Sequence, residues 1–553
     1  MQNIKDVVLK YALQNAVNYD GKANAGAVIG KVFAEFKDIK DKSSLAKQVQ
    51  EVIKQVNSMS FQAQRSKLES LAPELLEKKK VVETRKLHEL ENASPGKVIM
   101  RLAPYPSGSL HIGNARMVIL NDEYVKKYKG RLLLIIDDTI GSEEKTISKE
   151  AYKLIPSSLE WLQVKYQKPI IKKSDRLKIY YKYAEELIKK DKSYVCSCKS
   201  EVLRDNRATG KECSCRSQDT NKNLELWKKM FKSKEGSYTL RLKTDMQHPN
   251  PAFRDRVLFR IVQRKHPLIG SKYRIWPLLE FSWAIDDYLL GITHVLRGKD
   301  LMIESEVEKF IWDLFGWKHP VLIHHGLLQI EGTKLSKSKS KKEVESGLYF
   351  GWDDPRTWSL QSLERRGFKP EAIRNFILNL GLNPTEATVS VDALYAENRK
   401  LIDKECNRYF FVQDPKKIKI TNAPKIEAKA PLHPDFPNRG SRILKTSDEF
   451  YIEDNLEKDK NYRFMHLFNF KSNEFISQEL DQGLNAKLIH WLPVSKDLVN
   501  VEILMPSGDL IKGLGESSLK KLKVNNVIQF ERHAFCRLDK REKDKLVFWY
   551  THR

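Results

Sequence analysis

The hydrophobic pattern between residues 97 and 138 predicts a strand, a loop, a helix and a second strand. Residues 97–102 are short and β-branched, and residues 111–128 lack proline and contain glycine only at 113. Residues 131–136 form a continuous apolar run that ends at Asp137 and Asp138. Such a run is typical of a parallel strand covered on both faces. The pattern therefore predicts a nucleotide-type βαβ unit, which binds ligands at the carboxyl ends of its strands.

The regions before and after this βαβ unit show other hydrophobic periods. Apolar positions recur at helical spacing in residues 7–13 and 45–56, and again from 353 to 404. Residues 237–262 favour strands. Beyond about residue 415, short strand-like runs alternate with turns at 506–509 and 524–526, a regular spacing that predicts β-barrels.

Length and charge narrow the class of protein. A chain of 553 residues is too long for one hydrophobic core and should form several domains. The 98 Lys and Arg against 72 Asp and Glu give a net charge of +26, which suits a polyanion such as RNA without separating it from DNA or an acidic membrane. No apolar run approaches membrane-spanning length and the N-terminus lacks an apolar signal core, so we expect a cytoplasmic protein that does not bind membranes.

The loop within RLAPYPSGSLHIGNAR, residues 101–116, has the composition of a phosphate-binding loop. Gly108 permits close backbone approach, and the following helix offers free N–H groups and the positive end of its dipole. His111 stands at that helix start, where its imidazole can donate to a phosphate oxygen. A histidine that only caps the helix is the alternative. The candidate nucleotide-binding residues of this loop are Pro106, Ser107, Gly108, His111, Gly113 and Asn114.

A second basic loop, EGTKLSKSK at 331–339, follows a later apolar run. Lysines three residues apart, interleaved with serines, can close over a triphosphate. A solvated basic loop is the alternative interpretation. The candidate residues are Lys334, Ser336, Lys337 and Ser338.

Two Cys-x-Cys pairs predict a metal site. Cys196, Cys198, Cys213 and Cys215 lie in a polar stretch with little core of its own, where four thiolates favour a closed, structural Zn²⁺ site. Disulfides or unreacted thiols are the alternatives.

The order of these motifs resembles class I aminoacyl-tRNA synthetases, with HIGN for the HIGH signature and KLSKS for KMSKS. The surrounding motifs resemble glutamyl-tRNA synthetases of the archaeal type: RLAP at 101, DDT at 137, NPAFRD at 250, GITHVLR at 291 and WDDPR at 352. The resemblance covers nearly the whole chain. It implies a multidomain α/β fold with a Rossmann-type catalytic domain, a zinc-bearing insertion, an N-terminal helical domain and C-terminal all-β anticodon-binding barrels.

The expected domains follow this order. They are an N-terminal helical extension (1–95), the first Rossmann half (96–190), an acceptor-stem insertion with the cysteines (191–272), the second Rossmann half (273–345), a helical stem-contact region (346–414) and the β-barrels (415–553).

The resemblance implies a ligase that activates glutamate with ATP and Mg²⁺ and transfers it to tRNA-Glu, with tRNA-Gln left open as a second acceptor. His111, Lys334 and Lys337 would be the catalytic residues. Two rivals remain: a glutaminyl-tRNA synthetase, and a catalytically silent tRNA-binding paralogue. Asn114 in place of the second histidine of HIGH, and the unusual residues beside Asp137 and Thr139, favour the silent paralogue.

Three residues are predicted to bind glutamate: Arg101, Asp137 and Arg297. By similarity, Asp137 would bind the substrate ammonium group, although a strand-end aspartate is often a cap or turn residue. A guanidinium at 297 matches a carboxylate in bidentate fashion and suits an amide poorly, which argues against glutamine. An arginine that closes a strand can also be a plain ion-pair partner.

Overall fold

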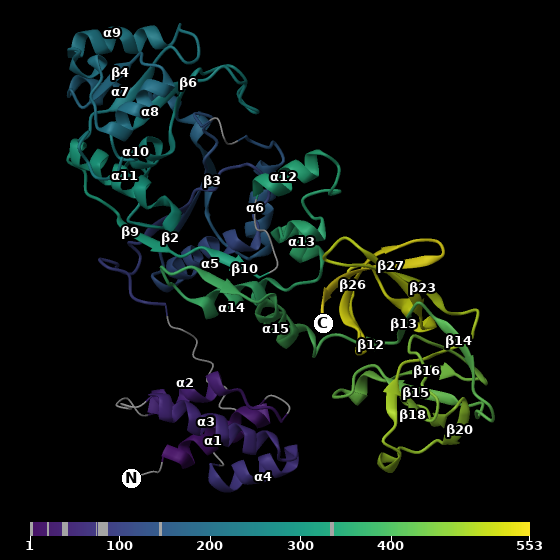
Figure 1. Cartoon of the computed structure of the whole chain (residues 1–553). Helices are drawn as coiled ribbons and strands as arrows, with labels where there is room; N and C mark the ends of the chain where they lie inside the picture. Colours follow the sequence, from purple (N-terminus) through teal and green to yellow (C-terminus); the bar gives the residue numbers. More distant parts are fainter. Residues whose placement is uncertain are drawn as a thin grey trace. The chain divides into compact units, whose positions relative to one another are not determined.

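The computed structural model describes residues 4–18, 21–35, 42–72, 75, 87–142, 146–331 and 337–553 (Figure 1). The chain divides into two compact units, residues 1–84 and 85–553. The first unit is helical, as its sequence period predicts, and packs around an apolar core that includes Val7, Leu13 and Val49. Its helices are α1 (Ile4–Asn18), α2 (Ala25–Glu35), α3 (Lys42–Asn57) and α4 (Phe61–Leu71).

The second unit begins with the predicted βαβ element. Strands β1 (Ile99–Leu102), β2 (Arg131–Ile136) and β3 (Gln167–Lys172) form a parallel sheet in that order, and α5 (Ile112–Lys127) connects β1 to β2. A two-stranded parallel sheet, β8 (His294–Gly298) and β9 (Val321–His325), lies beside β1, and Thr293 N–H donates to Ile99 O at 2.9 Å. Strands β1 and β8 start at the same edge, so their carboxyl ends meet at the opposite edge.

An insertion separates these two parallel sheets along the chain. Helices α6 (Ala151–Trp161) and α7 (Leu177–Lys189) flank β3 along the chain, and an antiparallel sheet with its own apolar core follows. Its strands are β4 (Ser193–Cys196), β5 (Thr239–Leu242), β6 (Val257–Ile261) and β7 (Ile275–Pro277). Helices α8 (Ser200–Thr209) and α9 (Thr220–Met230) lie between β4 and β5 in sequence. The chain returns to β8 through α10 (Leu279–Leu289).

Helices then lead from the parallel strands to the C-terminal region. In order these are α11 (Met302–Phe315), α12 (Lys337–Glu345), α13 (Leu360–Arg365), α14 (Pro370–Leu380) and α15 (Val391–Ile402). Strands β10 (Leu328–Ile330) and β11 (Ala387–Val389) form a parallel pair beside them. Helix α14 starts with proline, whose missing N–H would have no partner in the first turn.

The C-terminal region is all β, as the strand spacing predicts. Its largest sheet has the order β12 (Arg408–Tyr409), β25 (Val527–Phe530), β26 (Ala534–Arg541), β27 (Lys545–His552), β23 (Val499–Leu504), β24 (Leu510–Gly515) and β13 (Phe411–Gln413). Only Phe410 separates β12 from β13, although they lie at opposite ends of this order. The sheet must therefore curl until its ends meet, which gives a barrel.

Residues 416–493 form smaller sheets around a second β core that includes Phe450, Phe464 and Trp491. Their strands are β14 (Lys416–Lys419), β15 (Glu427–Pro431), β16 (Ser441–Lys445), β17 (Glu449–Ile452), β18 (Asn461–Phe464), β19 (Asn469–Lys471), β20 (Glu474–Ser477), β21 (Lys487–Ile489) and β22 (Leu492–Pro493).

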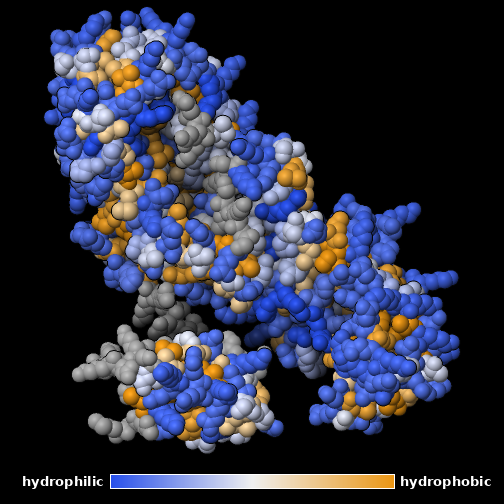
Figure 2. All heavy atoms as spheres, in the orientation of Figure 1, coloured by the Kyte–Doolittle hydropathy of each residue, from blue (hydrophilic) through white to orange (hydrophobic). Residues whose placement is uncertain are grey.

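The surface is mostly hydrophilic on the face drawn in Figure 2, with hydrophobic patches between the hydrophilic regions. Among the described helices, none combines the length and apolar character that crossing a membrane requires.

Candidate active site

His111 lies at the N-cap of α5, at the end of the loop that follows β1. Gly113 N–H donates to His111 Nδ1 at 3.1 Å, and His111 N–H donates to Asn114 Oδ1 at 3.2 Å. This reciprocal pair is a capping box, which satisfies two N–H groups at the helix start. Because Nδ1 accepts the hydrogen bond from Gly113 N–H, Nε2 is the ring nitrogen that can donate to a ligand. Asn114, which sequence comparison presents only as a departure from HIGH, fixes the backbone of His111.

Gly108 is required by a close packing contact. A Cβ at this position would lie 2.0 Å from the indole of Trp352, well inside contact distance. The same downstream segment holds the loop by backbone hydrogen bonds: Ile112 N–H donates to Trp358 O at 3.1 Å, and Leu360 N–H donates to Leu110 O at 2.8 Å. The loop is therefore held in place by residues 352–360, a contact that the sequence pattern does not predict.

Only some of the other predicted phosphate-binding residues lie in the described part of the chain. Pro106 O accepts from Ser148 N–H at 2.9 Å, and Ser107 N–H donates to Tyr105 O at 2.9 Å, so both belong to an ordered loop. Lys334 and Ser336 lie outside the described residues. Lys337 and Ser338 begin helix α12.

Arg101 and Arg297 converge on one aromatic ring. Their guanidinium carbons lie 4.9 and 5.0 Å from the ring centroid of Trp283, which comes from α10. Arg101 is at the end of β1 and Arg297 near the end of β8. Cations at this distance from an indole are attracted by its π face. The two arginines predicted to bind glutamate are therefore brought together in one place.

Each arginine is held by a buried carboxylate. Arg101 donates to Asp287 through Nε and Nη2, the latter at 2.8 Å. Arg297 donates to both oxygens of Glu308 at 2.9 and 2.8 Å, and to Ser305 Oγ at 2.6 Å. Burial raises the pKa of Glu308 to about 7, while Arg297 opposes that shift. Bidentate pairing fixes the plane of each guanidinium.

Asp137 follows β2 and is fully buried. Thr139 Oγ1 donates to its Oδ1 at 3.1 Å. Its Oδ2 has no hydrogen-bond partner among the described residues, although Lys173 Nζ lies 3.4 Å away. Trp283 Nε1 and Arg297 Nε are likewise buried without such a partner in the described part of the chain. Buried polar atoms in native proteins are normally satisfied, so these three atoms suit contacts with a polar ligand.

Asp138 has a structural role. It accepts from Ser174 N–H at 2.8 Å, from Ser174 Oγ at 2.7 Å and from Tyr152 OH at 2.9 Å. The two neighbouring carboxylates of the DDT motif therefore have different surroundings. Asp138 connects the end of β2 to the segment after β3 by hydrogen bonds, while Asp137 lies at the site of the two arginines.

The sequence gives no role to three side chains of this site, Lys173, Asp287 and Glu308, and suggests for Trp283 only that it shapes the pocket. Asp287 lies on a helix far along the chain from its partner Arg101, and Glu308 lies on a helix close in sequence to its partner Arg297. Neither carboxylate belongs to a sequence motif. Only the folded chain brings them together.

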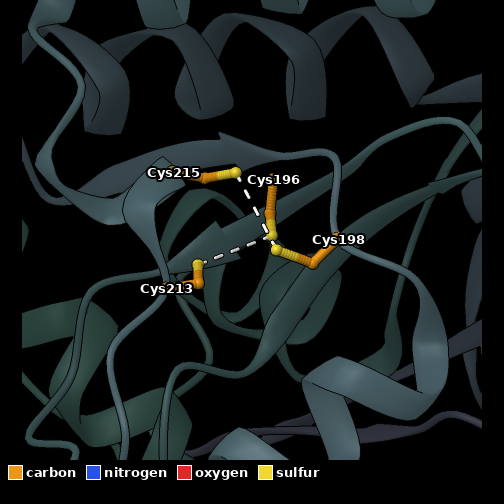
Figure 3. Close-up of side chains that lie close together, drawn as sticks. All are labelled: Cys196, Cys198, Cys213 and Cys215. Atoms are coloured by element: carbon orange, nitrogen blue, oxygen red, sulfur yellow. Dashed lines mark hydrogen bonds between the residues drawn. The ribbon is translucent and has the colours of Figure 1, made fainter.

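The four predicted metal ligands form one cluster in the insertion. Their sulfur atoms point toward one another (Figure 3) and all lie within 4.8 Å of each other. Cys196 and Cys213 are 3.8 Å apart, and Cys198 and Cys215 are 4.0 Å apart. Sulfurs bound tetrahedrally to zinc at about 2.3 Å lie about 3.8 Å from each other. The described cysteines contain no disulfide, and the donor set and spacing can hold a metal ion.

One cysteine of the cluster favours the thiolate form, whereas the hydrogen bond with Cys213 raises the pKa of Cys196 and burial raises that of Cys198. A hydrogen bond with Cys196 lowers the pKa of Cys213 to about 4, against the effect of burial. Arg241 Nη1 lies 3.7 Å from Cys213 Sγ and 3.9 Å from Cys196 Sγ. A nearby positive charge stabilises the thiolate form that metal binding requires.

Comparison with known families decides the assignment. The catalytic domain of class I tRNA synthetases of the E and Q type matches residues 97–404, and two anticodon-binding domains of the same group match residues 406–489 and 488–539. The catalytic match alone covers more than half of the chain. The chain belongs to the class I E and Q tRNA synthetases.

Similar curated proteins of this family match over their full length. The glutamate–tRNA ligase of Methanocaldococcus jannaschii is 42% identical over 565 residues, and that of Pyrococcus furiosus is 44% identical over 576 residues, with 100% of both chains covered in each case. The solved glutamate tRNA ligase of Elizabethkingia meningosepticum is 20% identical over 56% of this chain and 70% of its own, with a TM-score of 0.42.

Family membership confirms the predicted class and architecture. The resemblance to archaeal glutamyl enzymes and the order of a class I catalytic domain followed by β anticodon-binding domains are both confirmed. As a class I synthetase, the chain is an ATP-using, tRNA-binding ligase. The individual roles of the site residues remain predictions.

Proposed function

We propose that this protein attaches glutamate to tRNA-Glu through a glutamyl-adenylate formed from ATP. The observation that carries the proposal is the convergence of Arg101 and Arg297 on Trp283, beside the carboxylate of Asp137. Two guanidinium groups suit a substrate with two carboxylates, and an unsatisfied carboxylate oxygen suits an ammonium group. The names of the full-length relatives support the same substrate.

Arg297 would select glutamate over glutamine. Its Nε–H has no hydrogen-bond partner among the described residues and can donate to the γ-carboxylate. An amide in the same place would offer this N–H only a neutral acceptor, which makes a weaker hydrogen bond than a carboxylate does. Asp137 Oδ2 would accept from the ammonium group, and Arg101 would bind a substrate carboxylate.

The phosphates of Mg²⁺-ATP would lie at the N-terminus of α5. Pro106, Ser107, Gly108, Gly113 and Asn114 would shape that loop, and the lysine loop with Lys334, Ser336, Lys337 and Ser338 would approach from the other side. His111, Lys334 and Lys337 would stabilise the charge that develops on the phosphates during adenylate formation.

The tRNA would span several domains of the chain. The barrels (415–553) would bind the anticodon, and the insertion (191–272) would contact the acceptor stem. The four cysteines would hold one structural Zn²⁺, since four protein ligands leave no open coordination position. The net charge of +26 supports binding of such a polyanion.

Aminoacylation of tRNA-Glu with glutamate, compared with glutamine under the same conditions, tests the proposal. We expect glutamate to be transferred and glutamine to be rejected. Preference for glutamine would support the glutaminyl rival, and absence of both activities with retained tRNA binding would support the silent paralogue. The same assay with tRNA-Gln tests the second acceptor, which no relative's printed name mentions.

Two substitutions test the residue roles. Replacing His111 with alanine should lower kcat on the order of a hundredfold while tRNA binding is retained, because its contribution is greatest in the transition state. Replacing Arg297 with alanine should abolish glutamate use. Unchanged glutamate preference in Arg297→Ala would place the specificity determinant elsewhere, with Arg101 the next candidate.

A further inference from the structure

Lys173 is a third cation in the site of Arg101 and Arg297, and neither motif nor similarity points to it. It follows β3 and its side chain is fully buried. Its Nζ lies 5.0 Å from the Trp283 ring centroid, at the same distance as the guanidinium carbon of Arg297. Lys173 Nζ donates to Ser282 Oγ at 2.8 Å. Three positive side chains from β1, β8 and the end of β3 thus surround one indole.

The three cations differ in how completely carboxylates compensate them. Arg101 and Arg297 each make a bidentate pair with a buried carboxylate, so each pair carries no net charge. Lys173 has no such pair: its nearest carboxylate oxygen is Asp137 Oδ2, at 3.4 Å and without a hydrogen bond. Asp286, which also faces Lys173, is paired with Arg176 at 2.8 Å.

The charge of the site therefore depends on Lys173. With Lys173 charged and Glu308 ionised, as it is above about pH 7, the three cations balance the carboxylates of Asp137, Asp287 and Glu308. Without Lys173, the same groups carry one net negative charge. Free glutamate has two carboxylates and one ammonium group, hence one net negative charge, whereas glutamine has none. Burial reduces screening by water, so an added negative charge would repel glutamate strongly.

We propose that Lys173 is a specificity-determining residue, whose charge allows a site with three buried carboxylates to accept a dicarboxylic amino acid in preference to its amide. This inference rests on the proposed function. Burial lowers the pKa of Lys173, while Asp137 opposes that shift. The substrate carboxylates would strengthen the charged form further when glutamate enters. Arg297 would bind the γ-carboxylate. Because Glu308 neutralises the charge of Arg297, Lys173 would supply the positive charge that balances the γ-carboxylate.

The test compares Lys173→Met and Lys173→Gln with wild type in tRNA-Glu aminoacylation. Both variants should raise KM for glutamate by about tenfold or more, lower the preference for glutamate over glutamine by a similar factor, and leave KM for ATP within about twofold. KM does not depend on the fraction of enzyme that is folded, so partial misfolding would not imitate this pattern. The matched control is Lys172→Met, because Lys172 is the adjacent, partly exposed lysine and pairs with Asp175.

The outcomes separate the inference from the function on which it rests. Wild-type activity with glutamate and an unchanged glutamate KM in both variants would overturn the role of Lys173 alone. A raised KM in Lys173→Met with a normal KM in Lys173→Gln would also overturn it, because the glutamine side chain keeps a donor for Ser282 but no charge. A wild-type protein that does not activate glutamate would instead overturn the proposed function.

Discussion

At the scale of single residues, Glu308 makes the stability of the site depend on pH. Its pKa is raised from 4.5 to about 7, chiefly by burial. The folded chain therefore binds this proton more tightly than the unfolded chain, and the resulting stability is present below the unfolded pKa and lost as pH rises from about 4.5 to about 7. The Tm of wild type minus that of Glu308→Gln should be larger at about pH 5 than at about pH 7.5.

The control for that measurement is Glu306→Gln on the same helix, where the carboxylate is 57% exposed. Its Tm difference from wild type should stay nearly constant over the same interval. A Glu308→Gln difference that did not change with pH would show that Arg297 keeps the Glu308 carboxylate ionised throughout.

Sequence reasoning at this scale identifies residues that end strands and misses those that hold them. The place of Arg101 and Asp137 follows from the βαβ unit, which presents strand ends to one site. Their roles toward glutamate, and that of Arg297, rest on the family resemblance and on the match of a guanidinium to a carboxylate, and stay predictions. Their partners come from α10, α11 and the end of β3, where a buried charged residue looks the same in sequence as an exposed one. Lys173, beside the partly exposed Lys172, shows this limit most clearly.

At the scale of elements, the start of α5 depends on the side chain of Asn114. Its Oδ1 accepts from the N-cap N–H of His111. Asn114→Ala should therefore destabilise the catalytic domain by about 1 kcal/mol, the usual cost of a lost cap, while Asn114→Asp keeps the acceptor and should stay near wild type. Thermal unfolding of both variants checks this. Equal destabilisation by alanine and aspartate would mean that Asn114 acts through its amide group instead.

The cysteine cluster should make the insertion depend on metal. We expect about one zinc per chain in purified protein, and a lower Tm after chelation, because a closed tetrahedral site contributes folding energy directly. Replacing Cys213 with serine should release the metal. The matched controls are Cys406→Ser and Cys536→Ser, since both thiols are buried outside the cluster and should leave the zinc content unchanged. Zinc retained after replacement of all four cluster cysteines would disprove the site.

At the scale of the whole molecule, periodicity predicts the order of the elements and composition predicts the class of partner. The βαβ unit, the helices after it and the β-rich C-terminal region all follow from local pattern. The closure of the large barrel does not, because it requires β12 and β13, adjacent in sequence, to join opposite ends of one sheet. Neither does the packing of residues 352–360 against the loop of Gly108 and His111. Long-range pairing of this kind is fixed by tertiary contacts.

Arg365, at the end of α13, connects the barrel to that loop. Its Nε and Nη2 donate to Asp539 of β26 at 2.9 and 2.7 Å, and its guanidinium carbon lies 4.2 Å from the ring centroid of Trp549. Residues just before α13 bond to the phosphate loop. A tRNA that contacts both regions should therefore bind less well when this connection is lost. We expect Arg365→Ala to raise KM for tRNA a few-fold and to leave KM for glutamate unchanged.

A double-mutant cycle isolates the pair from other effects of the substitution. If the Arg365–Asp539 contact carries the connection, the effects of Arg365→Ala and Asp539→Ala on the tRNA KM should be less than additive in the double variant. Each single substitution also removes a second contact, that of Arg365 with Asp353 or that of Asp539 with Arg537. Lys540→Ala is the control, because Lys540 is the next residue of β26 and, within the described part of the chain, forms an ion pair only with nearby Glu542. Additive effects of the two substitutions would mean that each side chain acts separately. An unchanged tRNA KM in all three variants would mean that Arg366 holds the barrel instead. The Arg366 side chain donates to the backbone oxygens of Tyr550 and Thr551 at 3.1 and 2.9 Å.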